Sequence, residues 1–263
     1  METKGNIFIV AHSLIYKDTL EWGLYDTDAN RIIITDKNGQ LLTDTLLNMA
    51  AYHHNDYGYQ EPTRLDKNQL PMCSICDVRE TPNGYLFCAT LFETPTKTRF
   101  FLFETDKNLD LITTRKTDLP RAPYSAYSTI DDAWLGNMAV DSSGILLCGR
   151  MMYSDNKNIA VYYNWKFDTV WTARPKGYSL DPPTVALLPD RRYLLANTNI
   201  HDDAHMLQLW IISHEGKSGN ALTTSTLQYS EVSDVLIVGN YAYVIGEAKK
   251  GTRTTFLVKV ALQ

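Results

Sequence analysis

The sequence predicts an all-β fold, a β-propeller built from four-stranded antiparallel blades. Three features lead to this prediction: a strand–turn–strand pattern that recurs along the chain, further strands after each recurrence, and long uninterrupted apolar runs. The pattern is clearest in residues 137–150 (NMAVDSSGILLCGR), where two apolar strands flank an Asp-Ser-Ser-Gly turn. Polar residues followed by Gly between two apolar strands are typical of short hairpins.

The recurrence has a regular period in the second half of the chain. The pattern is repeated in residues 5–11, 77–90, 184–198 and 234–247, without its first strand in 5–11. The residues that start the second strand of the last three units, Ile145, Tyr193 and Tyr241, are 48 residues apart. Self-similarity with a period of about 40–50 residues indicates a repeat array or a propeller.

Each recurrence is followed by a third apolar strand, and three of them continue into a polar turn and a weaker fourth strand. These turns are Asp36-Lys37-Asn38-Gly39, Asp106-Lys107-Asn108 and His214-Glu215-Gly216. Four short antiparallel strands per unit describe a propeller blade. We therefore predict one domain over residues 1–263 with five blades, at about 5–47, 72–117, 133–174, 182–224 and 231–263. The terminal blades are expected to be incomplete or closed by the two termini.

Two apolar runs support packing on both faces of the middle strands. Leu86-Phe87-Cys88-Ala89 and Ile145-Leu146-Leu147-Cys148 do not alternate with polar residues, as strands covered on both faces do not. The hairpin anchors resemble those of kelch-type and sialidase-type propeller repeats over most of the chain, and this resemblance implies the same fold. A β-sandwich with accidental similarity between its hairpins is the alternative.

Composition limits the partners and the compartment. With 263 residues and 44% hydrophobic content, the chain can bury one full core. The net charge is −5 and no basic stripe is present, so nucleic acid is not an expected partner. No stretch is long enough to span a membrane. Residues 7–16 are interpreted as a strand and not as a signal peptide. A cytoplasmic location is slightly favoured, unless an export signal has been removed.

The four cysteines and one His/Asp motif carry side chains of the kinds that bind metals. Cys73 and Cys76 form a single CxxC on a strand, where residues three apart face opposite ways. Cys88 and Cys148 occupy equivalent core positions, so all four cysteines are expected to be reduced and structural. Residues 201–205 (HDDAH) carry metal-ligating side chains, but the segment is interpreted as a solvated hairpin turn. No metal and no cofactor are expected.

The long connections place tyrosines and acids on one face. In a four-stranded antiparallel blade, the connection to the next blade and the loop between strands two and three emerge on the same face. Residues 13–30 and 48–71 are the longest such segments, and aromatic loops of this length are usually functional. The predicted ligand-binding residues are Tyr52, His53, His54, Asp56, Tyr57, Tyr59, Tyr124, Tyr127, Asp132, Trp134, Tyr178 and Asp181.

None of these residues carries a motif specific enough to be assigned as catalytic. His53 or His54 beside a tyrosine suits a general base, and a polar loop is the simpler interpretation. Asp132 and Asp181 lie where chains enter the innermost strands, where propeller glycosidases place acid and base groups. Asp is also common at such positions only because its side chain hydrogen-bonds to the backbone of a turn. Trp165 and Trp171 either stack on a sugar or cover the edge of a blade.

The sequence therefore favours a non-enzymatic binding module that presents a tyrosine-rich rim to a protein or a glycan. Tyrosine gives a large contact area at low entropic cost, which suits both kinds of partner. The alternative is a glycan-acting enzyme of the glycoside hydrolase kind, with Asp56, Asp132 and Asp181 in acid and base roles. A pair of carboxylates across a pocket would favour the enzyme.

Overall fold

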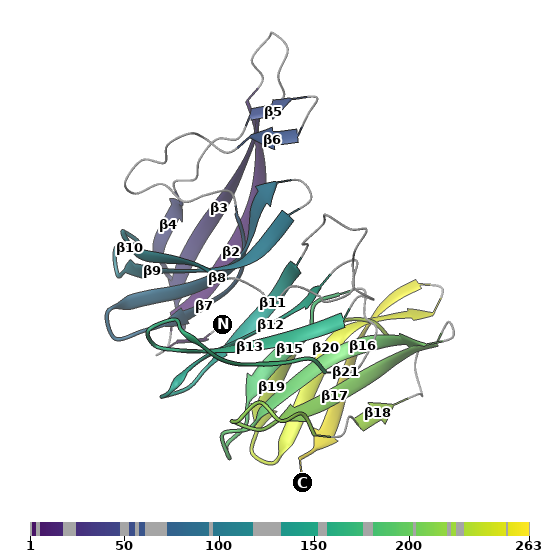
Figure 1. Ribbon diagram of the computed structural model, residues 1–263. Coiled ribbons are helices and arrows are strands. Elements are labelled where there is room, and N and C mark those ends of the chain that lie inside the picture. Colours follow the sequence, from purple (N-terminus) through teal and green to yellow (C-terminus); the bar gives the residue numbers. More distant parts are fainter. Residues whose placement is uncertain are drawn as a thin grey trace, which may run out of the picture. The chain divides into compact units, whose positions relative to one another are not determined.

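The structure, a computed structural model, consists of two compact units (Figure 1): Met1–Pro123 with Tyr127–Ala133, and Tyr124–Ala126 with Trp134–Gln263. It describes the backbone of residues 2–3, 6–17, 25–47, 53–55, 58–60, 73–94, 97–117, 133–151, 157–175, 181–201, 204–219, 222–224, 229–250 and 252–262. Side chains are described over 31–47, 73–91, 99–116, 134–151, 158–175, 181–198, 206–219, 231–248 and 254–262. Within the described residues, no helix has the length and apolar character needed to cross a membrane.

The N-terminal unit contains two four-stranded antiparallel sheets and a small hairpin. The first sheet consists, in spatial order, of β1 (Glu2–Thr3), β2 (Asn6–Lys17), β3 (Tyr25–Asp36) and β4 (Leu41–Leu46). The second consists of β7 (Cys73–Glu80), β8 (Gly84–Thr94), β9 (Lys97–Asp106) and β10 (Leu111–Thr117). The hairpin pairs β5 (His53–Asn55) with β6 (Gly58–Gln60), inside the segment predicted as a long loop.

The C-terminal unit contains three more sheets, each with sequential neighbours paired antiparallel. The first consists of β11 (Ala133–Val140), β12 (Gly144–Met151), β13 (Lys157–Asn164) and β14 (Thr169–Ala173). The central one consists of β15 (Thr184–Leu187), β16 (Tyr193–His201), β17 (Ala204–Ile212) and β18 (Leu222–Thr224). The last consists of β19 (Tyr229–Val238), β20 (Tyr241–Lys250) and β21 (Thr252–Ala261).

The terminal sheets are less complete than the other three, and the set of five sheets is consistent with five blades. β1 is only two residues long, and the last sheet has three strands among the described residues. The predicted insertion over residues 13–30 is largely strand, because β2 continues to Lys17 and β3 begins at Tyr25. Apolar runs do not predict this part of β3, because it contains polar residues such as Asp28, which pairs with Leu14.

The turns between third and fourth strands repeat one geometry four times. In the first of them, a carboxylate oxygen of Asp36 accepts hydrogen bonds from the backbone N–H groups of Asn38 and Gln40, both at 2.8 Å. The fourth residue of this turn, Gly39, has a φ of 82°. The same pair of side-chain bonds is made by Asp106, Asn164 and Ser213. Short polar side chains that bond their own backbone in this way are typical of tight turns.

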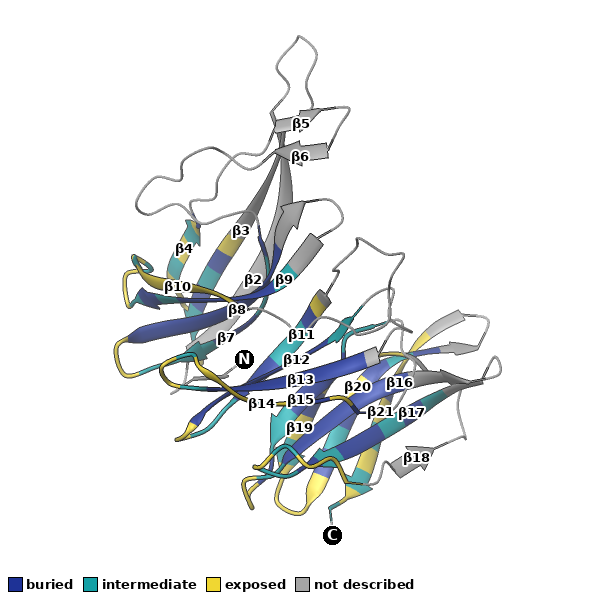
Figure 2. Cartoon of the chain, in the orientation of Figure 1, coloured by how far each residue is buried: buried dark blue, intermediate teal, exposed yellow. Residues whose placement is uncertain are grey.

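The core lies between the faces of neighbouring sheets within each unit (Figure 2). Both apolar runs identified in the sequence are fully buried, which confirms that prediction. In the C-terminal unit the central sheet is covered on both sides. Tyr193 and Leu195 of β16 pack with residues of β12 and β13, while Leu194 and Ala196 pack with residues of β19 and β20. The stacking of sheets therefore explains the continuous apolar pattern of β16.

Candidate functional site

The strands of the C-terminal unit have two ends, which differ in the connections they carry. The turn end carries the turns at residues 141–144, 164–168, 188–192 and 213–217, and the loop end carries the connections from β12 to β13 and from β16 to β17. The HDDAH motif lies at the loop end, where His201 of β16 pairs with Ala204 of β17. That pairing agrees with the prediction of a hairpin.

Asp181, a predicted ligand-binding residue, lies at the loop end just before β15. Its backbone carbonyl accepts a hydrogen bond of 3.0 Å from Asn197 Nδ2, and the same amide donates to Asn158 Oδ1 at 2.9 Å. Asn197 and Asn158 are both buried. These bonds hold the backbone at Asp181 in place, and the residue as a whole is half-buried.

A second polar contact joins the first and central sheets of this unit, between the middle of β11 and the start of β15. Asn137 of β11 donates from Nδ2 to Thr184 Oγ1 at 2.8 Å, and its Oδ1 accepts from the backbone N–H of Val185 at 2.7 Å. The buried thiol of Cys148 donates to Pro183 O at 3.0 Å. Neighbouring innermost strands are thus held by side-chain bonds, which sets the position of β15 and of the Asp181 segment before it.

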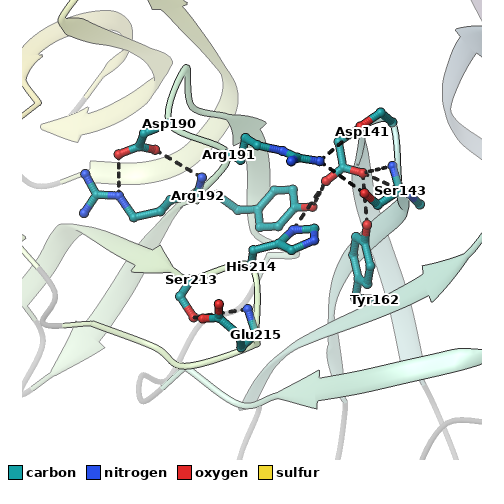
Figure 3. Close-up of polar contacts among 12 residues, drawn as sticks. Asp141, Ser143, Tyr162, Asp190, Arg191, Arg192, Ser213, His214 and Glu215 are labelled. Atoms are coloured by element: carbon teal, nitrogen blue, oxygen red, sulfur yellow. Dashed lines mark hydrogen bonds and ion pairs between the residues drawn. The ribbon is translucent and has the colours of Figure 1, made fainter.

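A third and larger polar cluster lies at the turn end, around Asp141 (Figure 3). The Asp141 side chain is only 3% exposed. Its Oδ2 accepts a 2.6 Å bond from the hydroxyl of Tyr193, and its Oδ1 accepts a 3.0 Å bond from that of Tyr162. Oδ1 also accepts from the backbone N–H groups of Ser143 at 2.6 Å and Gly144 at 2.9 Å. One buried carboxylate therefore joins its own turn to β13 and to β16 of the next sheet.

The surroundings of this carboxylate determine its pKa. Burial alone would raise the pKa of Asp141, but the bonds from Tyr193, Ser143, Tyr162 and Gly144 outweigh burial and lower it. Burial, and the bond to Asp141, raise the pKa of Tyr162 to about 12. The same causes, in the same order, raise the pKa of Tyr193. The cluster is therefore held as an ionised carboxylate with neutral tyrosines at neutral pH.

Aromatic side chains enclose the Asp141 cluster. The rings of Tyr162 and Trp171 stack with their centroids 5.3 Å apart, and Trp171 Nε1 donates to His214 O at 2.9 Å. His214 Nδ1 lies 3.5 Å from Asp141 Oδ2. A side chain at Gly216, whose φ is 82°, would meet the Trp171 ring at 2.7 Å. Because the carboxylate is closed off from solvent, we interpret Asp141 as a structural tie and not as an acid or base.

The sequence alone does not reveal this cluster. The sequence places Asp141 in an Asp-Ser-Ser-Gly turn, and it leaves Trp171 as either a sugar-stacking residue or a cover of the blade edge. The available signal is the tyrosine that each of two neighbouring units carries at an inward position, Tyr162 and Tyr193, beside a turn that begins with Asp. That signal becomes visible only once the units are aligned in space.

Most of the predicted ligand-binding residues lie outside the described side chains. His53 and His54 belong to β5 and Tyr59 to β6, where His54 pairs with Tyr59 through the backbone. Trp134 in β11 is described and is 40% exposed. The residues whose structure is not described are Tyr52, Asp56, Tyr57, Tyr124, Tyr127, Asp132 and Tyr178. The predicted rim therefore stays a prediction for all of them.

The CxxC segment of the N-terminal unit does not form a reactive site. Cys73 belongs to the hydrophobic core, whereas the Cys76 thiol donates to Ser74 O at 3.4 Å, and neither cysteine forms a disulfide. Burial raises the pKa of both thiols, that of Cys76 to about 11, so both stay protonated at neutral pH. Across the described residues, no group of three or more His, Cys, Asp or Glu side chains is placed to hold a metal ion.

A second buried carboxylate lies in the N-terminal unit, on β7. The Asp77 side chain is 6% exposed and forms an ion pair with Arg79 at 2.8 Å. It also accepts a hydrogen bond from the backbone N–H of Val78 at 2.8 Å. The position of Asp77 in its hairpin matches that of Asn137 in the first C-terminal sheet, eight residues before the start of the second strand pattern. We interpret both as structural polar groups of innermost strands.

Comparison with known proteins identifies the fold. No protein-family profile matches the chain, and no curated protein has a significantly similar sequence. Among solved structures, a GH43 β-1,3-galactosidase with galactodeoxynojirimycin is 6% identical with a TM-score of 0.51, covering 100% of this chain and 89% of that chain. A GH32 β-fructofuranosidase from Bombyx mori, in complex with sucrose, is 9% identical with a TM-score of 0.51. That match covers 99% of this chain but only 58% of the silkworm protein.

An endo-arabinase from Bacteroides thetaiotaomicron is also similar, with 12% identity, a TM-score of 0.48 and coverage of 92% of this chain and 89% of that chain. At identities this low, the likeness to the galactosidase and the β-fructofuranosidase shows the fold alone. The protein has an all-β fold of the β-propeller type with four-stranded antiparallel sheets, as the sequence predicts. The resemblance to kelch-type and sialidase-type repeats stays a prediction.

The comparisons correct the functional prediction. The sequence analysis favoured a non-enzymatic binding module, but the solved structures that share the fold across the whole chain include a galactosidase and a β-fructofuranosidase. The error arose because no catalytic motif is visible in the sequence, and a propeller without a motif was interpreted as a binder.

Proposed function

We propose that the protein is a glycan-acting enzyme of the glycoside hydrolase kind, with its reactive groups at the loop end. Fold alone does not specify chemistry, because one fold hosts many functions. The proposal therefore depends on one residue, Asp181, which is half-buried as a whole and lies at the entry to an innermost strand. The shared fold with a galactosidase and a β-fructofuranosidase supports it.

The local structure suits Asp181 to such a role. A catalytic carboxylate has to be held within a fraction of an ångström of its working position. The bond from Asn197 to the Asp181 carbonyl fixes the backbone before the strand, and Pro182 and Pro183 restrict φ at the next two positions. Asp181 as a whole is half-buried, so the residue is not sealed in the core.

Glycoside hydrolysis uses two carboxyl groups, one as acid and the other as base or nucleophile. Asp181 supplies one of them in this proposal. Asp56 and Asp132 stay candidates on the evidence of sequence alone. Trp134, with its exposed ring, suits contact with the apolar face of a sugar. We propose a glycan as the ligand of this end, with the predicted tyrosines as further contacts.

The test is turnover by the purified protein. The substrates are aryl β-galactoside, aryl α-arabinofuranoside and sucrose, which represent the sugars named for the structural neighbours. Released nitrophenol or reducing sugar is measured over hours, with heat-unfolded protein as the blank. Hydrolysis of one substrate class above the blank is expected. No hydrolysis of these substrates, or of the corresponding galactan, arabinan and levan, would overturn the proposal.

A further inference from the structure

Trp165, at the turn end of the C-terminal unit, is exposed to solvent and does not belong to the buried core. It is the second residue of the turn between β13 and β14, and it is 41% exposed. The matching positions of the two N-terminal turns are Lys37 and Lys107. The two tryptophans of this region therefore have different roles. Trp171 packs on Tyr162 and covers the Asp141 cluster, whereas Trp165 does not serve to fill the core.

The Trp165 ring is held in a fixed orientation. Its Nε1 donates a 3.2 Å hydrogen bond to the backbone carbonyl of Ser142 in the neighbouring turn. Its own turn is fixed by Asn164 Oδ1, which accepts from the backbone N–H groups of Lys166 at 2.8 Å and Asp168 at 3.0 Å. A preorganised side chain loses little entropy when a ligand binds to it. The ring is therefore a suitable platform for a flat partner.

Polar groups of the right kind lie beside the ring. Arg191, from the turn between β15 and β16, donates from Nη2 to Ser142 Oγ at 3.1 Å and to Ser143 Oγ at 3.2 Å (Figure 3). Arg191, Ser142 and Ser143 are all exposed. A hydroxyl has one donor and two lone pairs, so the bond from Arg191 occupies only part of the capacity of Ser142. A guanidinium has five N–H donors, and only those on one nitrogen make these bonds.

We propose that Trp165, Ser142 and Arg191 form an auxiliary binding site for an uncharged glycan, which we call the Trp165 surface. One sugar ring would stack its apolar face on the indole, and its hydroxyls would bond to Ser142 and Arg191. Since the Trp165 surface lies at the turn end and Asp181 at the loop end, it would retain a polymer and take no part in bond cleavage. The inference rests on the proposed function only in taking a glycan as the ligand.

The test measures retention of the full-length protein in native gels that contain arabinan, galactan or levan. Trp165→Ala is expected to bind the retaining polymer about tenfold more weakly than the wild type, the loss that follows from removing one anchoring contact. Trp165→Phe should restore part of the affinity, because it keeps an aromatic face. Lys107→Ala, at the matching turn position of the N-terminal unit, is the control and should bind as the wild type does.

Two results would overturn this inference. The first is equal retention of Trp165→Ala and the wild type by every polymer, including no retention of either. The second is retention only by polygalacturonate, an anionic polymer, which would assign Arg191 to an anion site. Hydrolysis of a short aryl glycoside separates this inference from the proposed function. Trp165→Ala should leave that rate unchanged, and weaker retention without any hydrolysis would refute the proposed function alone.

Discussion

Replacement of Asp141 by Ala should destabilise the C-terminal unit more than any other single carboxylate change among its described residues. The side chain accepts four hydrogen bonds, two of them from the hydroxyls of Tyr162 and Tyr193. A hydrogen bond to a charged group contributes about 1.5–3 kcal/mol, and each buried polar group left without a partner costs about 1–3 kcal/mol. Because the turn is partly exposed, the expected loss in the free energy of unfolding is about 3–5 kcal/mol.

A double-mutant cycle isolates the share of this destabilisation that comes from the hydrogen bond between sheets, from Tyr193 to Asp141. Tyr193→Phe alone removes one short bond and should cost about 1.5–3 kcal/mol. The double variant Asp141→Ala/Tyr193→Phe lacks both the carboxylate and the hydroxyl at position 193, so no unpaired hydroxyl remains at that position. The two changes should therefore cost about 1–2 kcal/mol less together than the sum of the single changes, since residues in contact are coupled.

The assay is urea unfolding followed by intrinsic fluorescence, with Asp190→Ala as the control. Asp190 lies in the neighbouring turn and makes a half-exposed ion pair with Arg192, so its removal should cost no more than about 1 kcal/mol. A loss below about 0.5 kcal/mol for Asp141→Ala would refute the reasoning. So would additivity of the Asp141 and Tyr193 changes within about 0.3–0.5 kcal/mol.

Three further predictions concern the same region. The lowered pKa of Asp141 stabilises the fold above about pH 4 and ceases to do so as the pH falls through its folded value, so Asp141→Asn should flatten the acid limb of a Tm–pH profile. The pKa of Tyr162 is raised to about 12, so its contribution to stability depends on pH in the opposite direction. The contribution is complete below about pH 10 and is lost as the pH rises above that value, so Tyr162→Phe should flatten the alkaline limb of the profile. Gly216→Ala should cost about 1–3 kcal/mol more than Gly239→Ala in urea unfolding, because both residues have positive φ but only the first would meet Trp171; equal costs would contradict the predicted clash.

The repeat could be predicted from the sequence because local chemistry specifies it. Turn residues such as Asp36 and Asn164 accept hydrogen bonds from the backbone of their own turns. The apolar run at 145–148 indicates that both faces of the strand are buried. Both signals lie within a few residues of sequence. They predict strands, turns and unit boundaries without knowledge of what packs against them.

The Asp141 cluster could not be predicted in this way, because its partners come from distant parts of the chain. Tyr162 lies 21 residues away and Tyr193 52 residues away, in the next sheet. Either tyrosine alone looks like an ordinary strand residue. The length of β3 was missed for a different reason: its first half is polar, and its pairing with β2 comes from backbone bonds that side-chain patterns do not reveal.

The central claim is that Asp181 takes part in glycan hydrolysis, and the most direct test compares two matched variants. Asp181→Asn and Asp190→Asn change the same functional group at opposite ends of β15. On the best substrate of the turnover test, kcat for Asp181→Asn should fall by about 10²–10⁴-fold, the usual contribution of an acid or base. Asp190→Asn should keep its rate within about twofold. Equal rates for the two variants, with both proteins folded, would contradict the account.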